Sequence, residues 1–479
     1  MNNTEVERLE MDWVISLENR LSDTNLWDRK RGATIYRVPD IMKKVDPQAY
    51  EPLIVSLGPY HHGKPHLQAM NQLKWKYLKA VLHLNCDMVL KDYLDLIKGL
   101  ETRARGAYSE EVNMSSNSFV EMMLLDGCFV MLTITGWIDP MEISKESTLW
   151  TRFNALQDIF ILENQLPFFL LETLFLSAFP QYDRDFFRSL TFMFIRKYFF
   201  SNIEFTSDNE TIHHIIHLFL SCIDPTTNNG NGNGNGNDNG NQSSTFGFLC
   251  NSKLVETVCV SLPSKLRSSL LSQVNSKMCT GRDANPEEDL PVPDLPWIPN
   301  ATVCNEARIH FKRKQKAKSF LDITFHKGKL EIPQIHIYYP TNSLLRNLIA
   351  YEQCSTDSKF RVTSYAVFMD YLIDTAADVE LLQQHEIIIS DLGDSQEIAT
   401  LFSKLNTNLC YNSEDFYIAD VIFAMKKHHD TRCNKWRARL NRDYFSSPWA
   451  AISLFGVLAL FVLTVIQTTY TVLSYYPSH

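Results

Sequence analysis

The fold of this chain turns on residues 450–473, which read Ala450-Ala-Ile-Ser-Leu-Phe-Gly-Val-Leu-Ala-Leu-Phe-Val-Leu-Thr-Val-Ile-Gln-Thr-Thr-Tyr-Thr-Val-Leu473. From Phe445 to His479 the sequence contains no Lys, Arg, Asp or Glu. An α-helix over this stretch is about 36 Å long, and the hydrocarbon core of a bilayer is about 30 Å thick. Because soluble helices rarely run so far without a charged face, we predict one C-terminal transmembrane helix at 450–473 and a short tail at 474–479. The alternative is a soluble protein whose last helix packs internally.

A basic cluster directly precedes the apolar stretch and predicts its orientation. The cluster consists of Lys426, Lys427, Arg432, Lys435, Arg437, Arg439 and Arg442. Because Lys and Arg favour the cytoplasmic side of a membrane, we predict a single-pass protein whose N-terminal body is cytosolic. Because the start of the chain is polar and acidic, we expect no secretory signal there. We expect the protein at the plasma membrane rather than the endoplasmic reticulum, in contact with the lipid bilayer through its C-terminal helix.

One side of the predicted membrane helix carries small and polar residues. At about 100° per residue, one face contains Ser453, Gly456, Thr464, Gln467 and Thr471. Transmembrane helices associate through such side chains, so we hypothesise self-association or pairing with another membrane protein. The alternative is that the Thr and Gln residues merely lie near the membrane interface.

Composition limits the classes of function. The chain of 479 residues is 45% hydrophobic, which indicates a folded body. Its net charge of −9 argues against nucleic acid as a partner, since nucleic-acid binding needs a basic surface. Its ten cysteines include no Cys-x-x-Cys pair, and we expect them to be buried thiols in a reducing cytosol. The histidines near 61–66 and 213–217 lack the partners of a metal site, so we expect no metal and no cofactor.

Residue patterns predict a mainly α fold. Residues 1–33 read as an amphipathic helix and a lead-in, and residues 34–445 as one large helical body interrupted by a flexible Asn/Gly tract at 226–244. Phe320 to Ile332 read as a small β-hairpin with its turn at Gly328, and 335–339 as a short strand. Helices are predicted around 66–83, 87–100, 118–136, 148–177, 183–201, 210–223, 341–354, 361–376, 378–385, 395–405 and 414–429.

Carboxylates within apolar helices are the first candidates for chemistry. Asp126 and Asp158 lie in such runs, as does the Glu163-Asn-Gln165 trio just before Pro167. Burying a carboxylate without a partner is costly, so these groups either lie at helix ends or meet bases. The candidate bases are Arg37, Lys74, Lys76 and Arg152. Glu121 and Asp126 are five positions apart and do not share a helix face, which favours structural roles over an acid–base pair.

Pro167 gives the polar trio a second structural reason. Its ring excludes a helical hydrogen bond to the carbonyl of Glu163, so we predict a bend there. The side chains of Asn164 and Gln165 are placed to satisfy the backbone groups that a bend leaves free.

Short runs along the whole chain resemble one family. The first half contains Ile35-Tyr-Arg-Val-Pro39, Ser56-Leu-Gly-Pro-Tyr-His-His-Gly63, Lys74-Trp-Lys-Tyr-Leu78, Met123-Leu-Leu-Asp-Gly-Cys-Phe129 and Leu162-Glu-Asn-Gln-Leu-Pro-Phe168. The second half contains Phe320-Leu-Asp-Ile-Thr-Phe325, Leu330-Glu-Ile-Pro333, Arg346-Asn-Leu-Ile-Ala350, Tyr351-Glu-Gln-Cys354, Phe368-Met-Asp-Tyr-Leu-Ile373, Asp378-Val-Glu-Leu-Leu382 and Tyr444-Phe-Ser-Ser-Pro-Trp449. In this order they resemble the plant domain-of-unknown-function family two-four-seven (DUF247), over about residues 34–475.

The resemblance implies a plant protein with a helical body, one C-terminal membrane helix and no established catalytic residues. Some similar grass proteins act in self-incompatibility. The sequence contains no nucleophile elbow, phosphate-binding loop or dinucleotide fingerprint. We therefore expect a membrane-anchored, non-enzymatic recognition, signalling or scaffold protein with an unknown protein partner. The alternative is an enzyme of unrecognised type acting at a membrane, with a cleft lined by Asp126, Glu163 or the His61–His62 turn.

Overall fold

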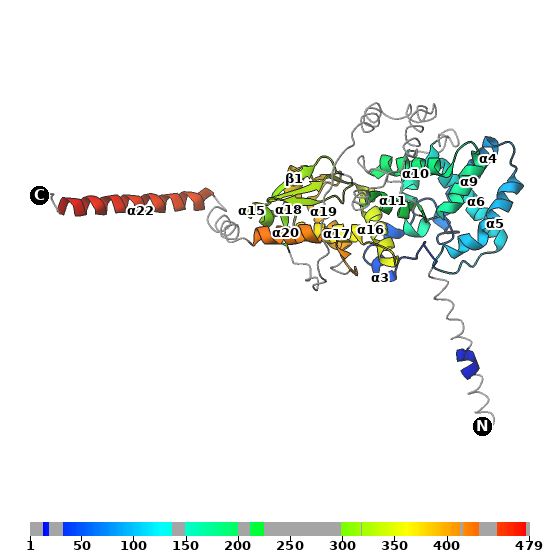
Figure 1. Cartoon of the computed structure of the whole chain (residues 1–479), viewed down its shortest axis with the longest axis horizontal. Helices are drawn as coiled ribbons and strands as arrows, with labels where there is room; N and C mark the ends of the chain where they lie inside the picture. Colours follow the sequence, from blue (N-terminus) through cyan, green and yellow to red (C-terminus); the bar gives the residue numbers. More distant parts are fainter. Residues whose placement is uncertain are drawn as a thin grey trace, which may run out of the picture. The chain divides into compact units, whose positions relative to one another are not determined.

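The computed structural model describes residues 13–18, 32–136, 149–199, 211–224, 298–317, 319–411, 415–430 and 448–475. These residues are mainly helical and include two small sheets, which confirms the predicted mainly α body with a small β element (Figure 1). Contacts divide the chain into two compact units. Unit 1 comprises residues 1–37 and 51–291, and unit 2 comprises residues 38–50 and 292–479. The predicted body at 34–445 thus contains parts of both.

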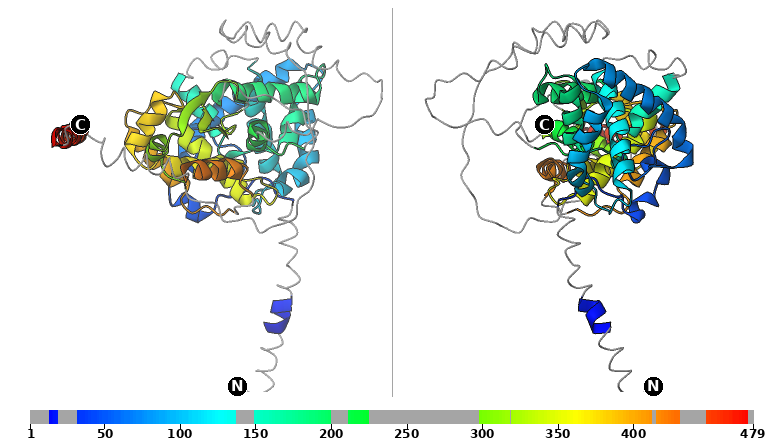
Figure 2. Two further views of the ribbon diagram at one scale, coloured as in Figure 1. Left: turned by 60° about the vertical axis from the view of Figure 1, so that its left-hand side comes forward. Right: turned by 90° about the vertical axis from the view of Figure 1, so that its right-hand side faces the viewer.

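Unit 1 is built around one buried helix, α6. The described helices of the unit are η2 (Pro65–Met70), α4 (Asn71–Leu84), α5 (Leu90–Gly106), α6 (Ser116–Thr135), α8 (Leu149–Asp158), η3 (Leu162–Asn164), α9 (Phe168–Ala178), α10 (Arg184–Phe199) and α11 (Ile215–Ile223). Helices α4, α5, α9 and α10 all pack against α6, and Figure 2 shows this group from two further sides. The side chain of Ser115 accepts a hydrogen bond from the Ser118 amide at the start of α6, and Gly136 ends it with a positive φ of 62°.

Length and composition alone would let α6 cross a membrane, because it has 20 apolar-rich residues. However, 83% of its apolar window is buried within the protein, as in the core helix of a folded domain. Gly127 belongs to this packing, since a Cβ atom there would lie 2.4 Å from Cδ1 of Leu174 on α9. The glycine therefore sets how closely α6 and α9 approach.

The prediction of one helix over 148–177 is wrong. The chain forms α8 and α9 instead, and it turns by 99° between them. Pro167 immediately precedes α9, where a proline is tolerated because no helical amide is required of it. The polar residues 163–165 occupy the break, so the sequence between the two helices was the signal for two elements rather than one bent helix.

Unit 2 contains both sheets. Strands β1 (His310–Lys314), β3 (Lys329–Pro333) and β2 (Thr324–His326) form one sheet in the order β1-β3-β2. The predicted hairpin is confirmed as the antiparallel β2–β3 pair, with positive φ at Lys327 and Gly328. Strand β1 pairs parallel with β3 and was not predicted, because its charged residues hide the strand pattern. The predicted strand near 335 is β4 (Ile335–Ile337), which pairs parallel with β5 (Ile388–Ser390).

Helices account for most of the described residues of unit 2 beyond its sheets. They are α3 (Asp40–Lys43), η1 (Pro47–Tyr50), α15 (Ala301–Glu306), α16 (Tyr339–Cys354), α17 (Arg361–Leu372), α18 (Ala376–Gln384), α19 (Ser395–Leu405), α20 (Ala419–His429) and α22 (Pro448–Tyr475). The short helices α3 and η1 come from the first tenth of the chain, yet they belong to this unit.

Residues 38–50 are held in unit 2 by α16. The side chain of Asn342 donates a hydrogen bond to Asp46, at 2.6 Å. The Ala49 carbonyl accepts from both Ser343 Oγ, at 2.5 Å, and Asn347 Nδ2, at 2.8 Å. Because Asn347 is fully buried, these contacts integrate the N-terminal segment into the unit rather than resting it on the surface.

Helix α22 covers the predicted C-terminal span. The apolar helix formed by its described side chains runs from Phe455 to Thr471, which is about 26 Å and so shorter than the bilayer core of about 30 Å. Its large apolar side chains with described exposure are between 45% and 72% exposed. The five residues of the hypothesised association face are all exposed on this helix.

Several predictions concern residues outside the described ranges. These include the Asn/Gly tract at 226–244, most of the predicted N-terminal helix, and the basic-cluster members Arg432, Lys435, Arg437, Arg439 and Arg442. The first two members, Lys426 and Lys427, lie in the last turn of α20. Among the described cysteines, Cys128, Cys222 and Cys304 are buried as expected. Cys86 and Cys410 are exposed, which corrects the expectation for them, since both lie in loops, two residues after α4 and five residues after α19.

Candidate functional site

The polar residues singled out from the first half of the sequence converge in unit 1 on a segment without helix or strand. This segment, Leu53–Gly58, passes through the interior, and Val55, Ser56 and Leu57 are buried. A buried stretch without regular structure cannot satisfy its own backbone groups, so side chains must do so. The candidate carboxylates and amides supply those partners.

Asp158 binds the first part of the segment. Its Oδ1 accepts a hydrogen bond from the Leu53 amide at 2.7 Å, and its Oδ2 accepts from the amides of Ile54 and Val55 at 2.8 Å. Burial outweighs these three hydrogen bonds and raises the pKa of Asp158 to about 6. By accepting from these three amides, Asp158 does for an irregular segment what a capping residue does for the first amides of a helix.

Asn164 and Gln165 satisfy the break between α8 and α9 as well as the segment. Asn164 Oδ1 accepts from the Leu57 amide at 2.6 Å, and its Nδ2 donates to the carbonyls of Val55 and Asp158. Gln165 Nε2 donates to the carbonyls of Ile159 and Ile161, at 2.6 and 2.9 Å. The prediction that these two amides satisfy backbone groups at a break is confirmed.

Asp126 and Lys74 form a buried ion pair that completes the segment. Oδ1 of Asp126 lies 2.5 Å from Nζ of Lys74, and both side chains are almost fully buried. Lys74 Nζ also donates to the Ser56 carbonyl at 2.6 Å, while Asp126 Oδ2 accepts from the Gly58 amide at 2.8 Å. Burial raises the pKa of Asp126, and the charge of Lys74 opposes that rise. The predicted partnership of a buried carboxylate with Lys74 is thus observed.

Gly58 is held in a conformation that favours glycine. Its φ is +68°, and a Cβ atom there would lie 2.8 Å from the Tyr108 hydroxyl oxygen and 3.1 Å from the Gln165 carbonyl oxygen. The Tyr108 hydroxyl donates to that same carbonyl at 3.0 Å. Position 58 therefore needs both the left-handed backbone and the missing side chain.

Glu163 is the centre of a network of charges. Its Oε2 lies 2.9 Å from Nη1 of Arg37 and 3.5 Å from Nε2 of His61. The other ring nitrogen of His61 lies 3.5 Å from Oε2 of Glu51, which also pairs with Lys64. The predicted partnership of a carboxylate with Arg37 is observed here. His61 was considered as a metal ligand; its side chain is 1% exposed and lies between the carboxylates of Glu163 and Glu51.

The histidines near position 213 have structural surroundings. His214 Nδ1 accepts from the His217 amide at the start of α11, and its Nε2 lies 2.9 Å from the Thr34 carbonyl. Burial lowers the pKa of His214 well below its usual value and that of His217 to about 4. Among the residues that the structure describes, no three His, Cys, Asp or Glu side chains are grouped to hold a metal ion.

Two further buried carboxylates lie in unit 2, and sequence reasoning assigned them no role. Glu352 accepts from the amides of Val362 and Thr363 at 2.8 Å, at the start of α17, and burial raises its pKa to about 7. Asp378 accepts from the amides of Thr302 and Thr375. Both belong to quoted sequence motifs, Tyr351-Glu-Gln-Cys354 and Asp378-Val-Glu-Leu-Leu382, which was the available signal.

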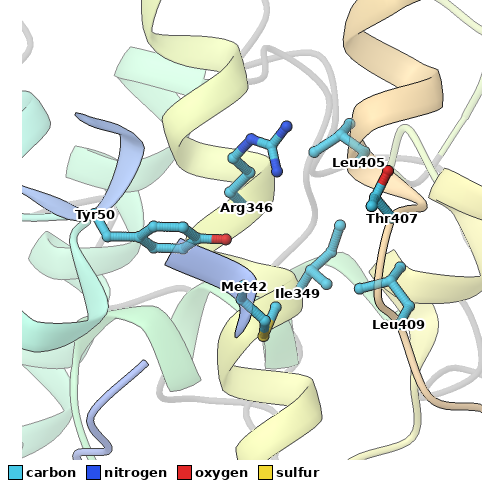
Figure 3. A pocket seen from close by; sticks show the side chains of 7 residues that line it. All are labelled: Met42, Tyr50, Arg346, Ile349, Leu405, Thr407 and Leu409. Atoms are coloured by element: carbon cyan, nitrogen blue, oxygen red, sulfur yellow. The ribbon is translucent and has the colours of Figure 1, made fainter. Parts of the chain in front are cut away.

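Figure 3 shows a small cavity within unit 2. It is lined by Met42, Tyr50, Arg346, Ile349, Leu405, Thr407 and Leu409. Its volume of about 10 Å³ accommodates roughly one water molecule. The buried guanidinium of Arg346 is held by Asn342, with Nε donating to Oδ1 at 2.9 Å. The cavity thus has a fixed cation in its wall but no room for a substrate.

Together these side chains can bind and position buried backbone. Asp126 and Glu163, which were predicted to line a cleft, both lie in the interior. Glu121 and Lys76 lie exposed on the surfaces of their helices, away from the buried pair. Lys74, Asp126, Asp158 and Asn164 therefore meet at the segment Leu53–Gly58, where they bind its backbone groups. Glu163 contacts Arg37 and His61 instead.

Comparison with known proteins places this chain among plant proteins. The family profile DUF247, described as plant protein of unknown function, matches residues 35–463. A UPF0481 protein of Arabidopsis thaliana is 27% identical over 454 residues, which cover 93% of this chain and 87% of the relative. A putative UPF0481 protein of the same plant is 23% identical over 97% of this chain and 96% of the relative. No solved structure matches the chain significantly.

Proposed function

The chain belongs to the DUF247 family of plant proteins of unknown function, and we propose that it is a membrane-anchored, non-enzymatic recognition or scaffold protein. In this proposal α22 inserts into a membrane as a single span. Units 1 and 2 then lie on the cytosolic side and bind a protein partner there. The plasma membrane is the proposed location.

Support for the anchor comes from the exposed apolar surface of α22. Phe455, Leu460 and Phe461 are each 66% or 67% exposed, and the helix contains no charged residue. A soluble protein rarely exposes so continuous an apolar surface, whereas lipid tails would cover it favourably. This exposed helix is the single observation that carries the proposal. The helical residues on either side of Phe455–Thr471 extend α22 to 28 residues, about 42 Å.

Support for a non-enzymatic role comes from the way the polar motif residues are used. Asp126, Asp158 and Asn164 each accept hydrogen bonds from backbone amides of residues 53–58. Catalytic acids and bases must reach a substrate, and these groups are directed at the backbone instead. We infer that the motifs stabilise a rigid body whose surface performs the function.

The anchor is tested by fractionation of plant cells that express the full chain or a chain truncated after Asp443. We expect the full chain to stay in the membrane pellet after carbonate extraction and the truncated chain to become soluble. Arginines in place of Leu460 and Leu463 should release the protein as well, because each costs about 2.5–3.5 kcal/mol at the centre of a span. Phenylalanines at the same positions are the matched control and should leave it in the pellet. Equal fractionation of all chains would refute the anchor.

Recognition is tested by proximity labelling with the same two chains. We expect a set of neighbouring proteins that is recovered with the full chain and lost on truncation, since the anchor concentrates the units at one membrane. Recovery of identical proteins with the full and truncated chains would contradict an anchored recognition role.

A further inference from the structure

The β1-β3-β2 sheet of unit 2 has one apolar side and one basic side. Along β1, His310 and Lys312 are exposed, whereas Phe311 between them is buried. The register places His310 opposite Lys329 of β3, and Lys329 opposite His326 of β2. Paired residues point to the same side of a sheet, so one row across it carries three basic or titratable side chains outward.

Carboxylates neutralise only part of this charge. Lys312 lies 3.4 Å from Glu331, and Lys314 lies 2.7 Å from Asp322. Within the described part of the chain, the other basic residues of this side and of the loops beside it make no ion pair. They are called the basic sheet face below and consist of His310, His326 and Lys329 on the strands, and of the exposed residues Arg308, Lys316 and Lys327 in the flanking loops. These side chains are therefore directed at solvent or at a partner.

The turn between β2 and β3 gathers several of these residues at one end of the sheet. Lys327 and Gly328 form the turn with φ of 49° and 79°. The Gly328 carbonyl accepts a hydrogen bond from the His310 amide at 2.8 Å, which brings Arg308 to the same end as Lys327. The basic residues Arg308 and Lys327, which come from separate segments, therefore lie at the same turn.

Helix α20 brings a second basic element to that turn. It packs on β2, where the ring of His428 lies 5.8 Å from the ring of Phe325. A Cβ atom on Gly328 would lie 3.0 Å from Cε1 of the same histidine. Phe325 pairs with the buried Leu330, so α20 packs on the apolar side of the sheet and its last turn adjoins the β2–β3 turn. That last turn also contains Lys426, Lys427 and His429, of which Lys426 and His429 pair with Asp430.

The chain leads from this place directly to α22. Helix α20 ends at His429 and α22 begins at Pro448, so the intervening residues span at most about 60 Å. This connection is itself basic in sequence, with Arg432, Lys435, Arg437, Arg439 and Arg442. A membrane that holds α22 therefore stays within reach of the α20 end of unit 2.

We propose that the basic sheet face binds the anionic phospholipid surface of the membrane that holds α22. This inference rests on the proposed anchor, which keeps the sheet near lipid headgroups at a high effective concentration. Anionic lipids attract basic residues near the membrane surface, and the effect of several residues accumulates. We favour lipid over nucleic acid as the partner. The chain as a whole has a net charge of −9, which would repel a polyanion free to approach it from all sides. A membrane that holds α22 meets the basic face alone.

The test compares the full chain in vesicles of phosphatidylcholine alone with vesicles that also contain phosphatidylserine. An amine-reactive acetylating reagent labels exposed lysines. Mass spectrometry then gives the rate of acetylation of Lys316, relative to the rate for a reference peptide in the same sample. Each basic residue near an anionic surface strengthens binding about fivefold, and the factors for several residues multiply, so the face should be bound for most of the time. If it is bound about four-fifths of the time, labelling of Lys316 slows about fivefold in the anionic vesicles, which is the least that we expect. High salt should restore the rate, because it screens the attraction.

Matched variants assign the effect to the basic sheet face. K327Q/K329Q should abolish the slower labelling of Lys316, whereas K327R/K329R keeps the charge and should retain it. Lys327 and Lys329 are exposed, so neither double variant should change the thermal unfolding temperature. Equal labelling of the unaltered chain in the two vesicle types would overturn the proposal. Slow labelling that survives in K327Q/K329Q would overturn it too, as would protection by added RNA or an acidic peptide but not by anionic vesicles.

Carbonate extraction from the neutral vesicles separates this proposal from the anchor. If carbonate removes the chain from neutral vesicles, the proposed membrane span fails whatever the labelling shows. If the chain resists extraction and its labelling does not depend on phosphatidylserine, only the role of the basic sheet face fails.

Discussion

Lys74 and Asp126 form an ion pair of 2.5 Å in the interior of unit 1, and each member also binds the backbone of the segment at 53–58. Lys74 comes from α4 and Asp126 from α6, so one pair fixes two helices and a buried segment without regular structure. Removing one partner leaves the other charge buried and uncompensated, which is more destabilising than losing the pair as a whole.

We expect Lys74→Met to destabilise unit 1 by about 3–5 kcal/mol. The combined K74M/D126N variant should recover part of that loss, because asparagine is neutral and its Oδ1 still accepts from the Gly58 amide. Urea unfolding, monitored by hydrogen exchange of amides within unit 1, measures the stability of both variants. A double variant that is less stable than K74M alone would contradict this account.

Replacing glycine with alanine should have opposite effects on stability at two positions. Gly58→Ala should destabilise the protein by several kcal/mol in total, since its positive φ is strained for alanine and the new Cβ meets the Gln165 carbonyl. Gly99→Ala should stabilise it by about 0.5–1 kcal/mol, because Gly99 lies within α5 and nothing lies within 4 Å of its added Cβ. Thermal unfolding distinguishes them, and a stabilised Gly58→Ala would be the contrary result.

Glu352 predicts a dependence of stability on pH. Burial raises its pKa from 4.5 to about 7, so the folded state holds the proton more tightly than the unfolded state. Its contribution to stability is therefore present in full below about pH 4.5 and is lost as the pH rises to about 7. The unaltered chain should gain roughly 3 kcal/mol relative to Glu352→Gln between pH 7 and pH 4.5. Urea unfolding at both pH values checks this, and a constant difference would argue against the shift.

The association face of α22 remains a prediction with a direct test. In detergent, the G456L/Q467L variant should lose self-association, because leucine removes both the close approach and the amide that pairs across helices. L458F/V462F alters the opposite face and serves as the control. Cross-linking of the full chain measures association, and equal dimer yields in all three chains would exclude this face.

The sequence predicted residue types at the polar cluster more accurately than their partners. Buried carboxylates next to Lys74 and Arg37 followed from the energetic penalty of an unpaired charge. Their other partner, the backbone of residues 53–58, did not follow, because it lies 103 to 105 positions from Asp158 and leaves no periodic pattern. The partners of Glu352 are only 10 and 11 positions away, at the amides of Val362 and Thr363, but its motif did not indicate that it would bind the start of the next helix.

Local patterns succeeded where one element decides its own structure. The hairpin at β2–β3 is specified by a turn with Gly328, and α6 by its cap and apolar length. Strand β1 was missed because it is defined by its neighbour β3 rather than by its own charged residues. The sequence predicted a bend at Pro167 but not two separate helices, because apolar periodicity continues on both sides of the α8–α9 break and only the polar residues at 163–165 interrupt it.

Residues 38–50 are incorporated into a unit whose other residues begin at 292. The Ala49 carbonyl binds side chains 294 and 298 positions further along the chain. At roughly 5–20 residues per second, a ribosome needs about 15–60 s to make that intervening length. During this interval the nascent segment lacks its partners on α16, although its neighbours in sequence belong to unit 1. We therefore expect unit 2 to complete its fold only after synthesis of α16, and chaperones that bind nascent chains to have this interval in which to bind residues 38–50.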